Sequence, residues 1–323
     1  MVELIGVRVL VTGGAGFIGS HLVDRLSQQK CKIIVYDNFD PFYTGKEDNI
    51  KHHFGNRNFR LIKGDILDFE TLCSAMKGVD IVFHEAAQAG VGYSMENPHK
   101  THMVNVTGTL NVLRAAKKQG VEKVISASSS SVYGIPEHLP MREEHPTKPL
   151  SIYGASKLAA EAYCHLFYKL FGLNTVSLRY FTVYGERNRP DMAVFKFTKL
   201  IFEGKPPIIY GDGSQTRDFT YVNDIVKGTI LAAEKDDIGG EPFNLGGGVQ
   251  TTVNDLLNQL LRLIGKQDII PVYDKPRPED MPHTLADISK ARKMLGYAPS
   301  TALEEGLRRF VSWYKERKAS SSA

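Results

Sequence analysis

The chain has 323 residues, of which 42% are hydrophobic and 24% are charged, and its formal net charge is +4. This composition is typical of a globular protein with one large domain and a smaller one, and its dispersed basic residues give no reason to expect a nucleic-acid partner. No apolar run approaches the roughly 18 residues of a membrane span, and the N-terminus lacks a signal-peptide pattern. The three cysteines have neither metal nor redox spacing, so we expect a cytoplasmic protein with reduced thiols and no membrane association.

The first predicted elements are a strand, a glycine-rich turn and a helix. The β-branched run at 8–12 predicts a buried strand. Gly13, Gly16 and Gly19 follow it, and apolar residues at helical spacing continue over 20–26. Such glycines allow a tight turn and the close approach of a pyrophosphate, whose charge is favoured at the N-terminus of the following helix. The order of these elements predicts a dinucleotide site.

A second predicted strand, at 32–36, ends at Asp37. A carboxylate at this offset from the glycine turn accepts hydrogen bonds from the adenosine ribose and repels a 2′-phosphate. The adjacent Asn38 brings no positive charge. We therefore predict NAD, rather than NADP, as the cofactor.

Strands and helices then alternate, as they do in a doubly wound parallel sheet. Beyond residue 182 the loops become richer in Pro, Gly and Arg, which predicts a smaller C-terminal α/β lobe that binds the substrate. The further predicted strands are 59–65, 81–84, 123–126 and 175–180. The predicted organisation is a Rossmann-type domain at 1–181, to which 212–235 is able to return, a substrate lobe at 182–315, and a solvated tail at 316–323.

Small or polar residues follow two of these strands. Asp65 and Ile66 end the third strand, where they are able to flank an adenine. Ala86 and Ala87 follow the fourth strand and are small enough for a cofactor to approach closely. Both pairs fit the predicted dinucleotide site.

Two histidines stand near the start of a long helix predicted after Pro98. On that helix, neither His99 nor His102 has a carboxylate partner or a third ligand. We interpret them as ordinary helix residues and expect no metal site.

Tyr153 and Lys157 stand four residues apart, where a proline-rich loop gives way to a predicted helix. Residues at this spacing share one helix face, so the phenol and the ammonium can meet over one cavity. An ammonium beside a phenol lowers the phenol pKa toward neutrality, and the phenolate is a base for a hydroxyl that is about to lose hydride. The pair alone is weak evidence, and it gains weight from the glycine turn and Asp37.

Four consecutive serines, 128–131, follow the fifth strand where it opens onto the predicted cleft. A serine hydroxyl at this place is able to hydrogen-bond a sugar oxygen and the Tyr153 phenol. A polar turn at a strand end is the alternative, and the serines by themselves favour neither interpretation.

These motifs together resemble those of the extended short-chain dehydrogenases/reductases, in the nucleotide-sugar 4-epimerase and dehydratase branch. The resemblance rests on the segments 12–19, 128–134, 153–157, 217–222 and 277–280 and covers about residues 6 to 315. It implies a catalytic triad of Ser129, Tyr153 and Lys157. It also implies a homodimer formed through the long helices after Pro98 and Leu150.

The resemblance further implies which residues contact the two ligands. The implied NAD contacts are Gly13, Gly16, Phe17, Ile18, Gly19, Asp37, Asn38, Asp65, Ile66, Ala86, Ala87, Asn105, Tyr153, Lys157 and Tyr180. The implied contacts of a UDP-sugar are Ser129, Ser130, Thr182, Arg189, Tyr210 beside the uracil, Arg217 and Arg277 at the diphosphate, and Asp280 near the uridine ribose. A guanidinium suits bidentate phosphate recognition, so residue chemistry and resemblance agree here.

The sugar itself is specified by the segment 179–193, which is most similar to that of UDP-glucuronate 4-epimerases. Most relatives carry Asn where this chain has Thr182. Arg189 precedes a Pro-Asp-Met-Ala run, and the resemblance implies that this arginine contacts the sugar carboxylate or lies close to it. Thr284 replaces a bulkier aromatic residue of many glucose/galactose epimerases. Gly92 departs from the pattern, because uronate epimerases often carry arginine there.

The implied reaction inverts C4 of UDP-glucuronate through a 4-keto intermediate and gives UDP-galacturonate. The alternatives are a UDP-glucose/UDP-galactose or N-acetyl-sugar 4-epimerase, a UDP-glucuronate decarboxylase, and a non-catalytic NAD-binding protein. A 4,6-dehydratase needs an acid/base pair beside the serine, where this chain has Ser130 and Ser131. A non-catalytic relative usually lacks one of the three catalytic residues, all of which are present.

Overall fold

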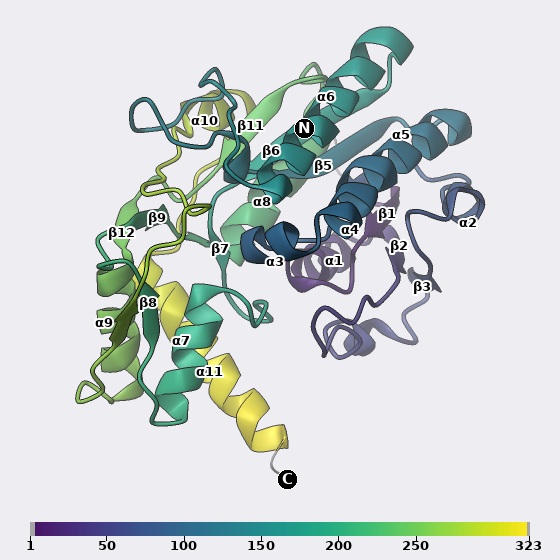
Figure 1. The fold of residues 1–323 in the computed structure, drawn as a ribbon. Coiled ribbons are helices and arrows are strands. Elements are labelled where there is room, and N and C mark those ends of the chain that lie inside the picture. The colour runs from purple at the N-terminus through teal and green to yellow at the C-terminus, as the bar shows by residue number, and fades with distance from the viewer. Residues whose placement is uncertain (1–3, 322–323) are drawn as a thin grey trace.

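A seven-stranded parallel sheet forms the centre of the computed structural model, which describes residues 4–321 (Figure 1). The strands are β1 Arg8–Thr12, β2 Lys32–Asp37, β3 Phe59–Lys63, β4 Ile81–His84, β5 Lys123–Ser129, β6 Asn174–Tyr180 and β11 Pro242–Leu245. Their spatial order is β11-β6-β5-β4-β1-β2-β3, so the order reverses between β1 and β4. Ligands of open α/β sheets bind at such a reversal, beyond the carboxyl ends of the strands. The predicted Rossmann-type fold is confirmed.

The first six strands lie where the sequence predicts them, and the seventh was missed. β11 pairs with β6 at the edge of the sheet. It has only four residues and begins with Pro242. Proline is tolerated at the first position of an edge strand, so the segment carries little strand signal in the sequence.

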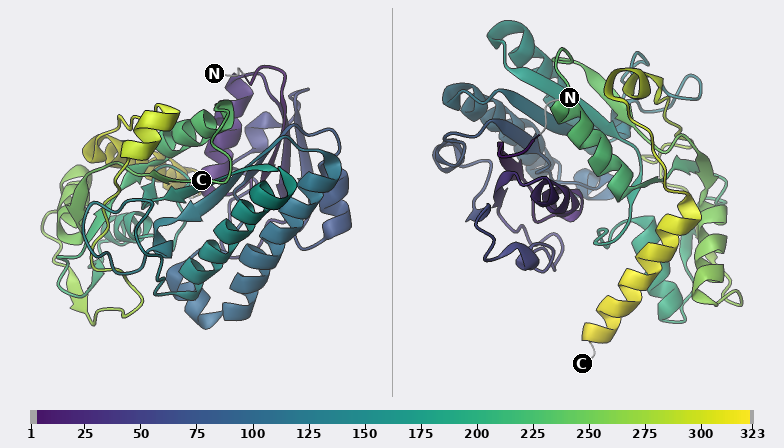
Figure 2. Two further views of the ribbon diagram at one scale, coloured as in Figure 1. Left: turned by 90° about the horizontal axis from the view of Figure 1, so that it is seen from above. Right: turned by 180° about the vertical axis from the view of Figure 1, so that it is seen from behind.

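Helices cover both faces of the sheet, as the two views of Figure 2 show. One layer contains α2 Phe69–Ala75, α5 Gly108–Gln119 and α6 Ile152–Phe171, and the other contains α1 Phe17–Gln28 and α8 Val222–Glu234. Leu10 packs into the core beneath the first layer, whereas Val9 and Val11 pack into the core beneath the second. A strand that is buried on both faces is apolar throughout, which explains its continuous β-branched run.

The helix that carries Tyr153 is fixed at both ends. Ser151 precedes α6, and its Oγ accepts a 3.1 Å hydrogen bond from the amide of Gly154. The helix ends at Gly172, whose φ of +68° is the left-handed conformation that glycine adopts most easily. A capped start close to the cleft holds the first turn of α6 in place.

The C-terminal half contributes a smaller lobe that faces the carboxyl ends of β5 and β6 (Figure 1). Its main helices are α7 Ala193–Phe202, α9 Val253–Ile264 and α11 Leu303–Ser321, and its short strands are β8 Ile208–Tyr210, β9 Thr216–Asp218, β12 Gln250–Thr252 and β13 Val272–Asp274. The smaller elements elsewhere are η1 Lys51–His53, α3 Val91–Glu96, α4 Pro98–His102, η2 Met103–Thr107, η3 Ser130–Val132, β7 Val183–Tyr184, β10 Thr220–Tyr221 and α10 Ser289–Leu295. The chain crosses between the two parts more than once, because α8 and β11, from the C-terminal half, belong to the large sheet domain.

The end of the chain differs from the prediction. The segment 316–323 was expected to be a frayed tail, but α11 continues to Ser321, and the last two residues lie outside the described part. The helix covers α9 of the lobe through its N-terminal half, and its exposed surface carries the charged residues that suggested a tail. Within residues 4–321, no helix combines the length and apolarity needed to cross a bilayer.

Candidate active site

Two adjoining cavities lie at the carboxyl edge of the sheet. The first is bordered by the glycine turn after β1 and by the ends of β2, β3 and β4. The second lies between the ends of β5 and β6 and the C-terminal lobe. The residues that line both cavities are Phe17, Ile18, Ser128, Tyr153, Tyr180 and Arg189. Two ligands bound in the two cavities would therefore meet beside Tyr153.

The glycine turn lies close against the segment that follows β4. Gly13 has a φ of +67°, and its amide donates a 2.8 Å hydrogen bond to the Tyr36 carbonyl. A Cβ at Gly13 would lie 2.7 Å from the backbone of Ala86, so only glycine fits between these segments. Gly16 precedes α1 and offers no side-chain acceptor, although the Phe17 amide donates to the Tyr43 hydroxyl. The positive end of the helix borders the first cavity.

Asp37 is held at the edge of this cavity by two backbone amides. Its Oδ2 accepts a 3.0 Å hydrogen bond from Ala15, and its Oδ1 accepts a 2.8 Å hydrogen bond from Phe39. Burial raises the pKa of the carboxyl, and these amides oppose the shift. Asn38 beside it donates to Asp65 at 2.9 Å, so the ends of β2 and β3 are joined at the cavity wall.

The structure brings all but one of the sequence-predicted cofactor residues together in the first cavity. Asn105 is the exception. It is buried, its Oδ1 accepts from the Gln88 amide at 2.7 Å, and its Nδ2 donates to the Ser156 hydroxyl at 2.9 Å. Asn105 thus supports Gln88, which does line the cavity. The predicted residues in the lining are Gly13, Gly16, Phe17, Ile18, Gly19, Asp37, Asn38, Asp65, Ile66, Ala86, Ala87, Tyr153, Lys157 and Tyr180.

Tyr153 and Lys157 both line the first cavity from the start of α6, as their spacing predicts. Their electrostatics differ from the expectation. Burial raises the pKa of Tyr153, and the Arg189 charge, followed by a hydrogen bond with Ser129, opposes this shift. Lys157 Nζ instead donates a 2.8 Å hydrogen bond to the Ala127 carbonyl, and burial lowers its pKa to about 8. Arg189 is the main cation that favours the phenolate in the described arrangement.

Glu85 is a partly buried acid of the cleft whose charge the sequence analysis overlooked. It follows β4, lines the first cavity, and accepts a 2.8 Å hydrogen bond from the Tyr180 hydroxyl. Burial raises the pKa of Glu85 to about 7, against the opposing effects of Tyr180 and Lys157. Its negative charge in turn raises the pKa of Lys157. A charged residue directly after an apolar strand was the available signal.

A second overlooked group comes from the loop after β2. Phe42, Tyr43 and Lys46 line the first cavity, and the Tyr43 hydroxyl accepts a 3.1 Å hydrogen bond from the Phe17 amide at the start of α1. The loop 39–48 has neither helical nor strand periodicity, so the sequence pattern gives no indication of where its side chains lie.

The serine run occupies the wall of the second cavity. Ser129 and Ser130 both line it, and the Ser129 hydroxyl lies 3.2 Å from the Ser131 hydroxyl and accepts from the Ser131 amide at 3.1 Å. Ser128 is held differently, since its hydroxyl donates a 2.5 Å hydrogen bond to Glu161. Glu161 also binds Arg179 through both carboxylate oxygens at 2.9 and 2.8 Å. This buried network fixes the strand end and leaves Ser129 directed toward Tyr153.

The far end of the second cavity is lined by an aromatic ring, two arginines and an acid. The Arg277 guanidinium lies 3.6 Å from the centre of the Tyr210 ring. Burial lowers the pKa of Arg217, and the Asp280 carboxylate only partly opposes this shift. All four residues line the cavity. Two partly buried arginines beside the Asp280 carboxylate favour an anionic ligand.

The segment predicted to recognise the sugar lies between these two ends. Thr182 lines the second cavity just after β6. Arg189 binds Asp191 through two hydrogen bonds, from Nε at 2.9 Å and from Nη2 at 2.8 Å. Burial works against the charge of Arg189, yet the Asp191 carboxylate raises its pKa.

Gly92 and Thr284 lie far apart in the sequence, and both border the second cavity. A Cβ at Gly92 would meet only Arg277, at 4.0 Å, so a longer side chain has room there. Thr284 is buried, and its hydroxyl accepts a 3.3 Å hydrogen bond from the Asp218 amide. Glycine at 92 therefore adds no charge of its own beside Arg277.

Sequence comparison places these features in a known family. The model of the family described as GDP-mannose 4,6 dehydratase matches residues 10–310. A UDP-glucuronate 4-epimerase of Thermodesulfobacterium geofontis is 42% identical over 313 residues, with 95% of this chain and 96% of the relative covered.

Solved structures agree with this result. The structure of UDP-glucuronic acid 4-epimerase from Bacillus cereus, in complex with UDP-glucuronic acid and NAD, superimposes with a TM-score of 0.91 at 38% identity, covering 96% of this chain and 99% of that one. The structure of UDP-N-acetylglucosamine 4-epimerase from Methanobrevibacter ruminantium, in complex with UDP-N-acetylmuramic acid, gives a TM-score of 0.90 at 37% identity, covering 97% and 99%. The similarity thus extends over the sheet, the lobe and the cleft between them.

Proposed function

Because the chain belongs to the extended short-chain dehydrogenase/reductase family whose model is described as GDP-mannose 4,6 dehydratase, we propose that it is an NAD-dependent UDP-sugar 4-epimerase that interconverts UDP-glucuronate and UDP-galacturonate. The observation that carries this proposal is the common wall of the two cavities. Tyr153 and Tyr180 border both of them, with Ser129 in the second and Lys157 in the first. A proton acceptor thus stands where a bound dinucleotide and a bound sugar would touch.

The first cavity fits NAD. Gly13 allows the close approach of backbone segments, the start of α1 borders the cavity and suits a pyrophosphate, and the Asp37 carboxylate suits a ribose without a 2′-phosphate. Lys157, which points from α6 into this cavity, is suited to a ribose hydroxyl near the nicotinamide. When bound, NAD+ supplies the acceptor for the C4 hydride and the donor that returns it.

In the proposed reaction, Tyr153 acts as the base that removes the proton from the sugar O4 while C4 loses hydride. The Arg189 charge and the Ser129 hydrogen bond both favour the phenolate, and Ser129 bridges O4 and the phenol. Tyr153 then returns the proton to O4 when hydride is added to the other face of C4. The reaction is redox-neutral, and its net result is inversion at C4.

Inversion requires the 4-keto sugar to turn over while the nucleotide remains bound. Tyr210, Arg217, Arg277 and Asp280 lie in the part of the second cavity assigned to the uridine and diphosphate, away from Tyr153. Binding energy concentrated on UDP leaves the sugar free to rotate, because the part that moves contributes little to affinity. We assign Tyr210 to the uracil, the two arginines to the diphosphate, and Asp280 to the uridine ribose.

A uronate substrate adds a constraint, because its 4-keto form is a β-keto acid and loses CO2 when the carboxylate bond is perpendicular to the ketone. Thr182 borders the sugar end of the cavity, and Arg189 adds positive charge there. We assign these two residues to the carboxylate, which they hold away from the alignment for decarboxylation. Ser130 beside them is assigned to the sugar hydroxyls.

A UDP-glucose or UDP-N-acetylhexosamine 4-epimerase is the second candidate. It is favoured by Gly92, which adds no charged side chain of its own to the cavity, and by the pairing of Arg189 with Asp191. The relative from Methanobrevibacter ruminantium acts, by its name, on a UDP-N-acetyl sugar. Comparing turnover of UDP-glucuronate, UDP-glucose and UDP-N-acetylglucosamine separates the two candidates.

We further propose a cytoplasmic homodimer. Leu166, Leu170 and Phe171 lie on α6 and are 45%, 67% and 48% exposed. An apolar surface of this kind on the helix layer is suited to a second copy of the chain. Sedimentation of the purified protein tests this assembly, and a monomer at micromolar concentration would contradict it.

The test of the catalytic assignment is Tyr153→Phe. Loss of the acid/base group predicts a fall in turnover of UDP-glucuronate of at least about 100-fold, with NAD still bound. Tyr163→Phe, on the same helix, is the control and leaves turnover unchanged. Undiminished epimerisation by Tyr153→Phe overturns the assignment.

A further inference from the structure

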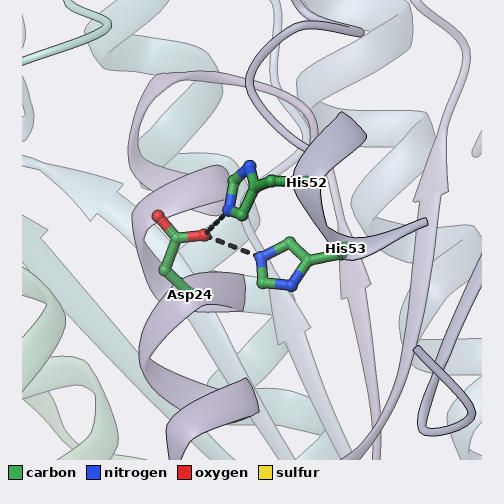
Figure 3. A group of neighbouring side chains, drawn as sticks. All are labelled: Asp24, His52 and His53. Atoms are coloured by element: carbon green, nitrogen blue, oxygen red, sulfur yellow. Dashed lines mark hydrogen bonds and ion pairs between the residues drawn. The ribbon is translucent and has the colours of Figure 1, made fainter. Parts of the chain in front are cut away.

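A cluster of two histidines and one aspartate lies outside both cavities of the cleft. Asp24 belongs to α1, and His52 and His53 form the end of the single-turn helix η1 (Figure 3). None of the three lines either cavity. The sequence analysis considered only His99 and His102 as metal ligands, because Asp24 is 28 residues from His52 in the chain.

Both imidazole rings point to the same carboxylate oxygen. His52 Nε2 and His53 Nε2 each lie 2.7 Å from Asp24 Oδ1, and all three ligand atoms lie within 4.8 Å of one another. Ligands of a tetrahedral zinc ion, at about 2.0–2.2 Å from the metal, are separated from one another by about 3.3 Å. A cation that takes the place of the hydrogen-bonding protons therefore requires each imidazole nitrogen to move roughly 0.6 Å further from Oδ1.

Two of the three side chains are already held in the required orientation. The His53 ring is buried and stacks on Phe59, with 5.3 Å between ring centres and 23° between ring planes. Asp24 is oriented by Arg187, whose Nη1 lies 2.8 Å from Asp24 Oδ2. An outer partner of this kind leaves Oδ1 as the ligand oxygen and fixes its direction. The positive charge of Arg187 also lowers the affinity for a cation, so a moderately tight site is expected.

The third side chain, that of His52, leaves the cluster open to solvent. His52 is 48% exposed, so solvent reaches the cluster from its side and a water molecule has space to complete four-coordination. Two neutral imidazoles with one carboxylate suit zinc, cobalt or nickel, whereas calcium and magnesium prefer oxygen ligands alone.

We propose that Asp24, His52 and His53 bind one divalent transition-metal ion of the zinc class. The ion joins α1 to η1, and η1 follows the loop 39–48 that lines the first cavity. Through Asp24 it also steadies Arg187, two residues before Arg189. The site is structural, and it does not depend on which sugar the cleft accepts.

The test is a titration of the full-length, tag-free protein with Co2+, followed by visible absorption, and with Zn2+, followed by calorimetry. Wild-type protein is expected to bind one ion and to develop the intense visible bands of tetrahedral Co2+. His52→Ala and Asp24→Asn are expected to weaken binding at least about tenfold. Because the His52 side chain is half exposed, this variant is expected to fold, which circular dichroism verifies.

The matched control is the double variant His99→Ala/His102→Ala, which removes two exposed histidines from the short helix α4. It is expected to bind Co2+ as the wild type does. The proposal is overturned if the wild type binds no ion, if His52→Ala binds as tightly as the wild type, or if the control loses affinity to the same extent.

Discussion

The Arg189 guanidinium binds the Asp191 carboxylate through two nitrogens, at 2.9 Å from Nε to Oδ1 and 2.8 Å from Nη2 to Oδ2. The bidentate face of this arginine is therefore already occupied by a residue of the same loop. What remains for the sugar is the third nitrogen and the long-range effect of the charge. That charge is the foremost influence opposing the burial that raises the pKa of Tyr153, while Asp191 acts in the same direction as burial.

This pair predicts two pH shifts of opposite sign. In Asp191→Asn the negative charge is lost, so the pKa of Tyr153 falls and the acidic limb of the rate profile moves to lower pH. In Arg189→Gln the positive charge is lost, so the same limb moves to higher pH. Initial rates from pH 5 to 10 measure the acidic limb of each variant. If the two limbs move in the same direction, or do not move, the electrostatic role assigned to Arg189 and Asp191 is contradicted.

Thr182 is expected to control the fate of the keto acid. Thr182→Ala removes the hydroxyl assigned to the carboxylate, so a larger share of UDP-glucuronate ends as a decarboxylated 4-keto pentose. Thr182→Ser keeps the hydroxyl and is expected to restore the wild-type partition. Product ratios by NMR decide the point, and equal ratios in the two variants would show that the hydroxyl has no such role.

Arg277 is expected to contribute binding rather than chemistry. Loss of a charge-assisted hydrogen bond to a phosphate costs about 2 kcal/mol, which corresponds to roughly a 30-fold rise in KM, with kcat little changed. The effect of Arg277→Ala is the same for UDP-glucuronate and UDP-glucose, because both carry the diphosphate. Arg292→Ala removes an exposed arginine of α10 and serves as the control. A variant that lowers kcat at unchanged KM would exclude the diphosphate assignment.

Glu85 is expected to set the alkaline limb of activity through Lys157. Burial lowers the pKa of Lys157 to about 8, and the Glu85 charge is the main influence that raises it. In Glu85→Gln this influence is lost, the ammonium gives up its proton at lower pH, and the alkaline limb moves to lower pH. The amide oxygen can still accept from Tyr180, which preserves the local packing. Glu122→Gln, an exposed change before β5, leaves the limb unmoved. If the alkaline limb of Glu85→Gln does not differ from that of the control, the coupling of Glu85 to Lys157 is disproved.

Local patterns were sufficient to predict most of the sheet and the glycine turn. Buried parallel strands are apolar on both faces, so the runs at 8–12 and 81–84 are visible without a structure. The strand 242–245 could not be predicted from the sequence, since it is short, begins with proline and is defined by its pairing with β6. The end of helix α11 was not predicted, because its charged residues resemble those of a solvated tail.

Features that depend on long-range contacts could not be predicted in the same way. The spacing of Tyr153 and Lys157 placed both at one cavity, but their pKa values depend on burial and on Glu85 and Arg189, which come from other parts of the chain. Asn105 was assigned to the cofactor by resemblance, and in the structure it supports Gln88 behind the cavity wall. The pairing of Asp24 with His52 and His53 likewise arises only when α1 and η1 pack together.

The most direct test of the central proposal is the fate of deuterium at C4 of UDP-glucuronate, followed by NMR after incubation with the protein and NAD. If the hydride leaves C4 and returns to its other face within one closed cleft, the product is UDP-galacturonate with the deuterium retained at C4. A UDP-pentose as the main product, or UDP-galacturonate whose C4 carries hydrogen from the solvent, would contradict it.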